Sequence, residues 1–233
     1  MAGGPMLELD GEPVAVRLRR SPRARRLSLR LDRQGEGVLV VAPSWVADRT
    51  VDAFLDQQRA WIASRLAVRP PATAIEPGAA IPLRGVPHVI RHCADTRMAV
   101  RVEDGHLLVG GDQAHLVRRV TDWLRAEARR EADAKARALA GSISAPVRAI
   151  TVRDMVSRWG SCTADGRLAF SWRLILAPTG VFDYVVAHEV AHLRHFDHSP
   201  AFWRLVETLC PGHARPRAWL RREGECLHRI GRP

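Results

Sequence analysis

The chain has 233 residues, of which 46% are hydrophobic, enough to build the core of one large domain or two small ones. No stretch approaches the ~18 consecutive apolar residues of a membrane-spanning helix, and no basic segment followed by an apolar run marks a signal peptide. The four cysteines are scattered without a CxxC pair, which argues against a disulfide framework and a cysteine-built zinc finger. We therefore expect a soluble protein of a reducing cytoplasm, without a membrane partner.

The net charge of +11 and the pI near 11.1 are typical of proteins that bind nucleic acid or another polyanion. Lys135 is the only lysine among the 36 basic residues, so a coding bias toward arginine is an alternative explanation of the charge. A polyanion site requires clustered cations. The cluster to test comprises Arg17, Arg19, Arg20, Arg23, Arg25 and Arg26.

The first part of the chain predicts a small β-rich domain. Short runs at 14–18, 27–31 and 38–42 alternate as antiparallel strands do, and a helix is expected over 47–67 with its apolar stripe on that sheet. Further strands are expected at 86–92, 99–103 and 106–109. Gly110 and Gly111 then favour a boundary, which gives an N-terminal domain of residues 1–112 with one helix.

Residues 113–233 predict a second domain of the α+β class. A long amphipathic helix is expected over 115–139, followed by strands at 147–152 and 167–172. Three helices are expected next, at 181–195, 200–209 and 214–228. The first of these three helices contains a motif that carries chemistry.

The motif is His188-Glu189-Val190-Ala191-His192, an HExxH sequence inside a strongly apolar helix. Residues four apart lie ~40° apart around a helix axis, so His188 and His192 project from one face and can bind one metal ion. Glu189 can reach a metal-bound water without occupying a coordination position. The spacing therefore predicts a zinc site with a general base beside it.

A third ligand is expected at His198. Ten residues after His188, a continued helix would rotate it by ~280°, away from the metal, so the helix has to end before it. Ser199 is a good N-cap and Pro200 a good first helical residue, which predicts a new helix immediately after His198. Three histidines and one open position make a catalytic zinc site, with one zinc ion per chain.

Other readings of this motif remain open at the level of sequence. His188 and His192 are alternatively two buried, hydrogen-bonded histidines without a metal. His195 or Cys162 is an alternative third ligand, and so is a downstream glutamate, Glu207 or Glu223, as in other zincins.

Further segments carry a resemblance to a known family. They are, in chain order, Arg158-Trp159-Gly160-Ser161-Cys162, Phe170-Ser171-Trp172-Arg173-Leu174, Ala177-Pro178, Asp183-Tyr184-Val185-Val186-Ala187-His188-Glu189 and His198-Ser199-Pro200-Ala201-Phe202-Trp203. In order and approximate spacing they resemble the YgjP-type metallopeptidase family, which is related to the SprT-like and WLM zincins. The likeness runs from about residue 147 to residue 220.

The resemblance implies a zincin-like catalytic domain in which His188, His192 and His198 bind zinc and Glu189 is the catalytic base. Metzincins share the offset of the third histidine but usually have glycine at the position of His195 and a later methionine turn, and no methionine follows Met155. The resemblance implies no particular substrate, since a nucleotide phosphohydrolase activity has also been attached to relatives.

Residues around the motif are candidates for substrate binding or for orienting ligands. Trp159, Gly160 and Ser161 either form a turn and edge strand beside the cleft, where an extended peptide can add as a strand, or are core and turn residues. Tyr184 lies one turn before His188 and either hydrogen-bonds near the metal or packs. Asp197 either orients a ligand histidine or is a solvated turn residue.

The sequence therefore predicts a zinc-dependent metallopeptidase acting on polypeptides, with Glu189 as general base. The first alternative is a metal-dependent nucleotide phosphohydrolase, although no P-loop is present. The second is a basic, nucleic-acid-associated zinc protein, which combined with protease activity becomes an enzyme that processes DNA-bound proteins.

Overall fold

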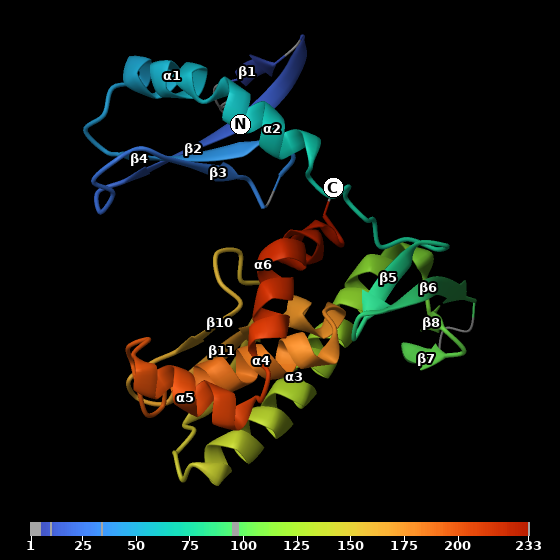
Figure 1. The fold of residues 1–233 in the computed structure, drawn as a ribbon. Helices are drawn as coiled ribbons and strands as arrows, with labels where there is room; N and C mark the ends of the chain where they lie inside the picture. The colour runs from blue at the N-terminus through green and yellow to red at the C-terminus, as the bar shows by residue number, and fades with distance from the viewer. Residues whose placement is uncertain (1–5, 10, 34, 95–97, 233) are drawn as a thin grey trace. The chain divides into compact units, whose positions relative to one another are not determined.

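The computed structural model describes residues 6–9, 11–33, 35–94 and 98–232 (Figure 1). Contacts divide the chain into two compact units, unit 1 with Met1–Pro71 and Arg232–Pro233, and unit 2 with Ala72–Gly231. The sequence places the domain boundary between residues 112 and 113 instead. The strands that follow residue 79 fall in unit 2 because Ile81, Ile90 and Leu107 share one apolar core with the long helix that begins at Leu116.

Unit 1 contains a sheet with the order β1-β2-β4-β3. Its strands are β1 (Met6–Leu9), β2 (Glu12–Ser21), β3 (Ser28–Leu31) and β4 (Val38–Pro43). The predicted purely antiparallel sheet is wrong, because β2 and β4 pair in parallel, whereas β3 and β4 are antiparallel. The reason is topological. β4 reverses direction after β3 and lies between β3 and β2, so it runs in the same direction as β2.

The helix expected over 47–67 is two helices, α1 (Asp48–Gln57) and α2 (Arg59–Ala67). It is interrupted at Gln58, whose φ of −96° and ψ of 4° leave the α-helical region. Val51 and Leu55 of α1 and Ile62 of α2 pack in one core with Val38 and Val40 of β4. The expected apolar stripe on the sheet is therefore confirmed, on both halves of the interrupted helix.

Unit 2 contains two small sheets within the described residues. One has the order β5-β6-β8-β7 and consists of β5 (Ala80–Leu83), β6 (Val86–Cys93), β7 (Arg101–Glu103) and β8 (His106–Gly110). The other has the order β10-β11-β9 and consists of β9 (Ala149–Arg153), β10 (Gly160–Cys162) and β11 (Arg167–Ser171), with β10 antiparallel at its edge. Strands β1 and β5 were missed at the level of sequence.

The helices of unit 2 are α3 (Leu116–Ser142), α4 (Thr179–Ala191), α5 (Pro200–Leu209) and α6 (Ala214–Arg229), with short 3-10 helices η1 (Gln113–His115) and η2 (Trp172–Leu176). Helix α3 buries every fourth residue: Leu116, Val120, Leu124, Ala128, Ala132, Ala136 and Ala140. The small alanines let α4 and η2 approach α3 closely. None of the described helices is both long enough and apolar enough to cross a membrane.

Helix α4 lies at the centre of unit 2, in contact with α3, α5, α6, β10 and β11 (Figure 1). Its burial on most sides explains why eight of the eleven residues from Val181 to Ala191 are apolar. The HExxH motif sits in the second half of this helix. The predicted α+β class, with an HExxH helix, a small sheet and flanking helices after a β-rich N-terminal region, is confirmed.

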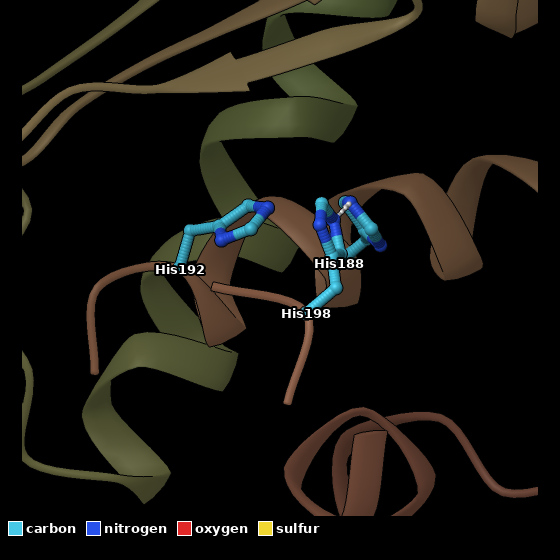
Figure 2. Close-up of side chains that lie close together, drawn as sticks. All are labelled: His188, His192 and His198. Carbon is cyan, nitrogen blue, oxygen red and sulfur yellow. Dashed lines mark hydrogen bonds between the residues drawn. The ribbon is translucent and has the colours of Figure 1, made fainter. Parts of the chain in front are cut away.

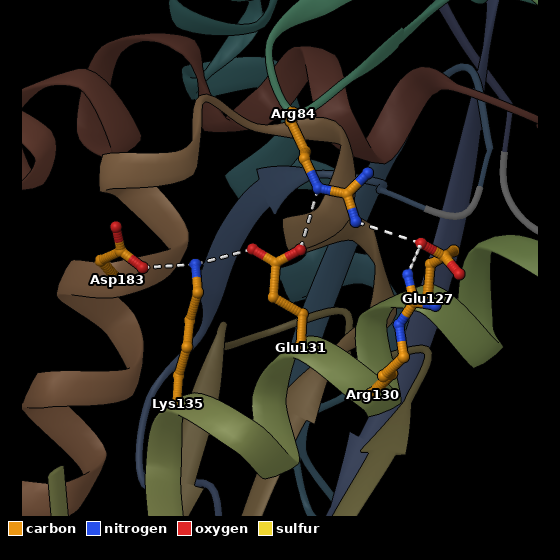
Figure 3. A network of polar contacts seen from close by, with 6 residues as sticks. All are labelled: Arg84, Glu127, Arg130, Glu131, Lys135 and Asp183. Atoms are coloured by element: carbon orange, nitrogen blue, oxygen red, sulfur yellow. Dashed lines mark hydrogen bonds and ion pairs between the residues drawn. The ribbon is translucent and has the colours of Figure 1, made fainter. Parts of the chain in front are cut away.

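A network of ion pairs fixes α4 against its neighbours (Figure 3). Arg84, in the β5–β6 turn, donates to Glu127 at 3.1 Å and to Glu131 at 3.0 Å, both on α3. Lys135 of α3 binds Glu131 at 2.6 Å and also pairs with Asp183 of α4. The network therefore links the β5–β6 turn, α3 and the first half of α4, and its side chains are partly buried.

Candidate metal centre

The end of α4 determines where the histidines of the motif point. The helix ends at Ala191 and His192 is its C-cap, so the predicted extension to His195 is wrong. Leu193 and Arg194 instead make turn hydrogen bonds to Val190 and Ala191 at 3.0 and 3.1 Å. The chain therefore makes one more turn, closed by the His195 N–H on the Ala191 carbonyl at 3.0 Å, before it leaves the helix.

A second helix begins where the sequence predicts it. Ser199 is the N-cap of α5, its hydroxyl accepting from the Phe202 backbone N–H at 3.4 Å, and Pro200 is the first helical residue. His198 therefore lies at the junction between two helices. This junction turns its side chain back toward α4 (Figure 2).

The three histidines converge. One ring nitrogen from each of His188, His192 and His198 lies within 4.8 Å of the others. The two Nε2 atoms of His188 and His198 are 3.3 Å apart, and the three ring centroids are separated by 4.9 to 5.1 Å. Figure 2 shows the rings gathered at the end of α4. Converging nitrogens of this kind can hold a metal ion.

One pair of these donors, on His188 and His198, has the spacing of a zinc site, and the three donors lie within 4.8 Å of one another. Two nitrogens that each bind a tetrahedral zinc ion at about 2.05 Å are about 3.3 Å apart, which is the separation between His188 and His198. Nδ1 of His192 donates to the backbone carbonyl of His195 at 2.9 Å, which leaves its Nε2 free to bind a metal ion. Burial, with smaller contributions from the two neighbouring histidines, lowers the pKa of His188 to about 3. The imidazole is therefore neutral, as a metal ligand requires.

Glu189 is buried beside the histidines, with 6% of its surface exposed. Burial raises the pKa of its carboxyl to about 8, against a weaker opposing effect of Arg158. Gly160 of the edge strand β10 packs directly on this side chain, because a Cβ at Gly160 would lie 2.6 Å from both Cγ and Oε1 of Glu189. Only glycine allows the strand to pass this close to the carboxylate.

A cavity of about 250 Å³ opens at this point. It is lined by Arg158, Trp159, Gly160, Tyr184, Val185, His188, Glu189 and Leu220. His188 and Glu189 thus face a common space, whose volume suits one side chain rather than a large ligand. The structure brings the predicted base and one predicted ligand together at the wall of this cavity.

Of the five candidates around the motif, three line the cavity and two do not. Trp159, Gly160 and Tyr184 line the cavity, and the ring of Tyr184 contacts that of His188 edge-on at 5.9 Å. Ser161 pairs with Ala169 in the sheet. Asp197 accepts from the Ser199 backbone N–H at 3.4 Å, so its carboxylate shapes the turn before α5.

The alternative ligands are engaged elsewhere. Burial, with Glu189 and Asp165 nearby, raises the pKa of Cys162 to about 11, which disfavours the thiolate that binds metal. Glu207 accepts from Nδ1 of His213 at 2.6 Å, and Glu223 accepts from Arg222 at 2.6 Å. The histidine cluster is accordingly the group of metal-binding side chains that the described residues bring together.

Two aromatic contacts of the site were not foreseen. Phe202 of α5, fully buried, places its ring 4.6 to 4.9 Å from all three histidine rings and forms the floor of the cluster. His213 stacks between Tyr184 and Trp203, at 6.2 and 5.5 Å. The apolar residue three positions after the N-cap is a signal for Phe202, whereas nothing in the local pattern places His213 here.

Comparison with known proteins gives a family match over most of the chain. The model of the YgjP-like family, described as a metallopeptidase domain, matches residues 25–223, a span that contains the three histidines and Glu189. A solved structure, the metallopeptidase zymogen of Pyrococcus abyssi abylysin, matches with 20% identity and a TM-score of 0.35, over 40% of this chain and 95% of that one. No curated protein matches the chain.

Proposed function

The chain belongs to the YgjP-like metallopeptidase family, and from this premise we propose that it is a zinc peptidase with His188, His192 and His198 as ligands and Glu189 as general base. The observation that carries the proposal is the convergence of three ring nitrogens within 4.8 Å beside a buried carboxyl. Three imidazoles leave one coordination position open, as a catalytic zinc site requires.

Zinc held there would supply a Lewis acid that polarises the scissile carbonyl and lowers the pKa of a water molecule to about 7. The chain's own contribution begins with Glu189, whose burial raises its pKa and whose ionised form a nearby zinc cation would favour. The carboxylate then accepts a proton from the attacking water. The same group then donates that proton to the leaving amine. The contact with Gly160 holds the carboxyl in place for both transfers.

The substrate we propose is an extended polypeptide lying along β10. This strand forms the edge of its sheet and passes over Glu189, so its outer backbone groups are available to pair with a peptide. The cavity beside it accommodates one substrate side chain against Trp159, Tyr184 and Leu220. Arg158 is the one cation among the residues lining this cavity, which supports a peptide more than a triphosphate.

The test measures metal content and hydrolysis in the same preparations. We expect about one zinc per chain, loss of casein cleavage on treatment with a chelator, and recovery on adding zinc. Glu189→Gln should keep the metal and lose at least about a hundredfold in rate, because general acid–base catalysis contributes about 10²–10⁴. Glu223→Gln, a control at a partly exposed glutamate on α6, should keep both.

Undiminished cleavage by metal-replete Glu189→Gln would overturn the assignment of the base. Hydrolysis of nucleoside triphosphates but not of casein, sensitive to chelator, would replace the peptidase with a phosphohydrolase at the same site.

A further inference from the structure

The two faces of the unit 1 sheet differ in chemistry. Residues directly opposite one another on neighbouring strands project to the same face. Val16, Val38 and Leu31 occupy one such row and lie in the core beneath α1 and α2, which cover that face (Figure 1). Arg17, Leu39 and Arg30 form the adjacent row and therefore project from the opposite face.

Arginines are concentrated on this second face and on the loop that continues from it. Residues 17–33 contain eight arginines and one acidic residue, Asp32. Two members of the predicted cluster have structural partners: Arg17 pairs with Asp32, and Arg20 binds the carbonyl of Val46 and the carboxylate of Asp48. Arg19, Arg23, Arg25, Arg26 and Arg30 are exposed and have no ion-pair partner among the described residues.

Two of these exposed arginines, Arg19 and Arg30, are close enough to repel each other. Burial and then the guanidinium groups of Arg19 and Arg33 lower the pKa of Arg30. Like charges held together on a folded surface destabilise it unless an anion neutralises them. The face therefore has a charge that a polyanion complements.

An exposed tryptophan lies at the same end of the sheet. Strands β2 and β4 are parallel and end together, Ser21 opposite Pro43, so the loop 22–27 and the turn 44–47 emerge side by side. Trp45 in that turn is 78% exposed. Arg20 fixes the turn by donating to the carbonyls of Pro43 and Val46, so the indole is held outward by ordered backbone.

We propose that this arginine surface, defined by Arg19, Arg23, Arg25, Arg26, Arg30 and Trp45, binds single-stranded nucleic acid. Guanidinium groups pair with backbone phosphates in bidentate geometry, and an exposed indole stacks on an unpaired base. A membrane anchor buries a broad apolar face instead, whereas Trp45 lies in the turn beside the loop that carries Arg23, Arg25 and Arg26. None of these residues belongs to the peptidase site, so the nucleic acid would be a second ligand besides the peptide substrate.

The test uses the full chain and a fluorescent oligothymidine of about 15 nucleotides, long enough for one such binding surface. Binding is followed by anisotropy over a salt series. Replacing Arg23, Arg25 and Arg26 together with alanine should reduce the salt slope by about 2, since each phosphate contact on a single strand contributes about 0.7. Replacing Arg125, Arg129 and Arg137 on α3 removes the same charge from exposed positions and should leave the slope unchanged.

Base stacking is tested separately. Trp45→Ala should weaken binding roughly tenfold, and Trp45→Phe should retain most of the affinity. An oligomer of abasic nucleotides carries the same phosphates, so its affinity should not respond to Trp45→Ala.

Four results would overturn the proposal. Equal loss in the two arginine triples means that net charge alone attracts the oligomer. Equal loss of affinity for the abasic oligomer in Trp45→Ala removes the stacking role. Binding to phosphatidylserine vesicles without binding to oligothymidine assigns the surface to a membrane, and failure to bind either probe at low salt removes the ligand altogether.

Discussion

The polar groups of α4 and those of the arginine surface lie in opposite environments. Glu189 is buried in an apolar helix, where an ionisable group destabilises the fold, so its presence there indicates a function. Arg23, Arg25 and Arg26 project into water, where a charge has little effect on stability. A polar residue inside is therefore strong evidence for a role, and a charged residue outside is weak evidence until a second feature, here Trp45, accompanies it.

The largest effect is expected at the third ligand. His198→Ala should remove one of three zinc donors and lower both metal affinity and casein hydrolysis by more than about a hundredfold, at least the effect of losing a metal-orienting partner. His195→Ala is the matched control, because that residue contributes its backbone carbonyl to His192 and its side chain is outside the cluster. Zinc titration against a competing chelator measures both variants.

Equal zinc affinity in His198→Ala and the parent protein would remove this residue from the site. Loss of zinc in His195→Ala but not in His198→Ala would exchange their roles.

Arg173 sharpens the comparison, because it is a buried charge that binds backbone carbonyls and a carboxylate outside the histidine cluster. Its side chain is 3% exposed and donates to the carbonyls of Leu227 and Ile230 and to Asp154, at 2.8, 2.7 and 2.9 Å. Arg173→Met should lower the free energy of unfolding by about 3 kcal/mol, because removing one partner leaves buried polar groups unpaired. Urea denaturation measures the change.

The exposed Arg222 provides the control, and Arg222→Met should change the free energy of unfolding by less than about 0.5 kcal/mol. Zinc content per folded molecule should be unchanged in Arg173→Met. If folded Arg173→Met protein lost its zinc, Arg173 would belong to the metal site. The distinction between Glu189 as a functional buried charge and Arg173 as a structural one would then fail.

Gly160 tests whether close packing on Glu189 matters for catalysis. In Gly160→Ala the new methyl group would lie 2.6 Å from Cγ and Oε1 of Glu189, so the carboxyl has to move. We expect cleavage to fall about a hundredfold, equivalent to about 2.7 kcal/mol of transition-state stabilisation. Zinc content should persist, because the histidines are not displaced.

Gly180→Ala is the matched control, since a Cβ at that helical position meets nothing within 4 Å. It should leave cleavage unchanged and slightly increase stability, as alanine does in a helix. Full activity in Gly160→Ala would mean that the position of Glu189 tolerates a shift of this size.

The cluster of histidines could be predicted because local rules determine it. Helical spacing places His188 and His192 on one face. Ser199 and Pro200 start the next helix, so that His198 lies at the junction and its side chain points back toward α4. The α+β class followed from the same periodicities. The contact between Gly160 and Glu189, the Phe202 floor and the position of His213 depend on the packing of β10, α5 and α6 around α4, and such contacts between distant segments leave no local pattern.

The wrong strand pairing in unit 1 and the difference between the predicted boundary and the contact-based division have the same origin. Strand pairing is a long-range property, so alternation in residues 14–42 indicates strands without determining that β2 runs parallel to β4. Gly110 and Gly111 are local signals of a turn, yet β5 to β8 share their core with α3. Glycines in the sequence predict where an element ends, but they do not determine which hydrophobic core the element joins.

The smallest effect is expected at Trp45, and it tests the exterior half of the comparison. Because its indole is 78% exposed, Trp45→Ala should change the free energy of unfolding by less than about 0.5 kcal/mol. Ile62→Ala, in the same unit but fully buried, should lower it by about 2–5 kcal/mol through the cavity it leaves. Denaturation curves of the two variants, followed by circular dichroism, give both values. If Trp45→Ala lowered the free energy of unfolding as much as Ile62→Ala, the indole would be packed in solution and not available to stack on a base. If stability were unchanged, the indole would be free to take part in binding.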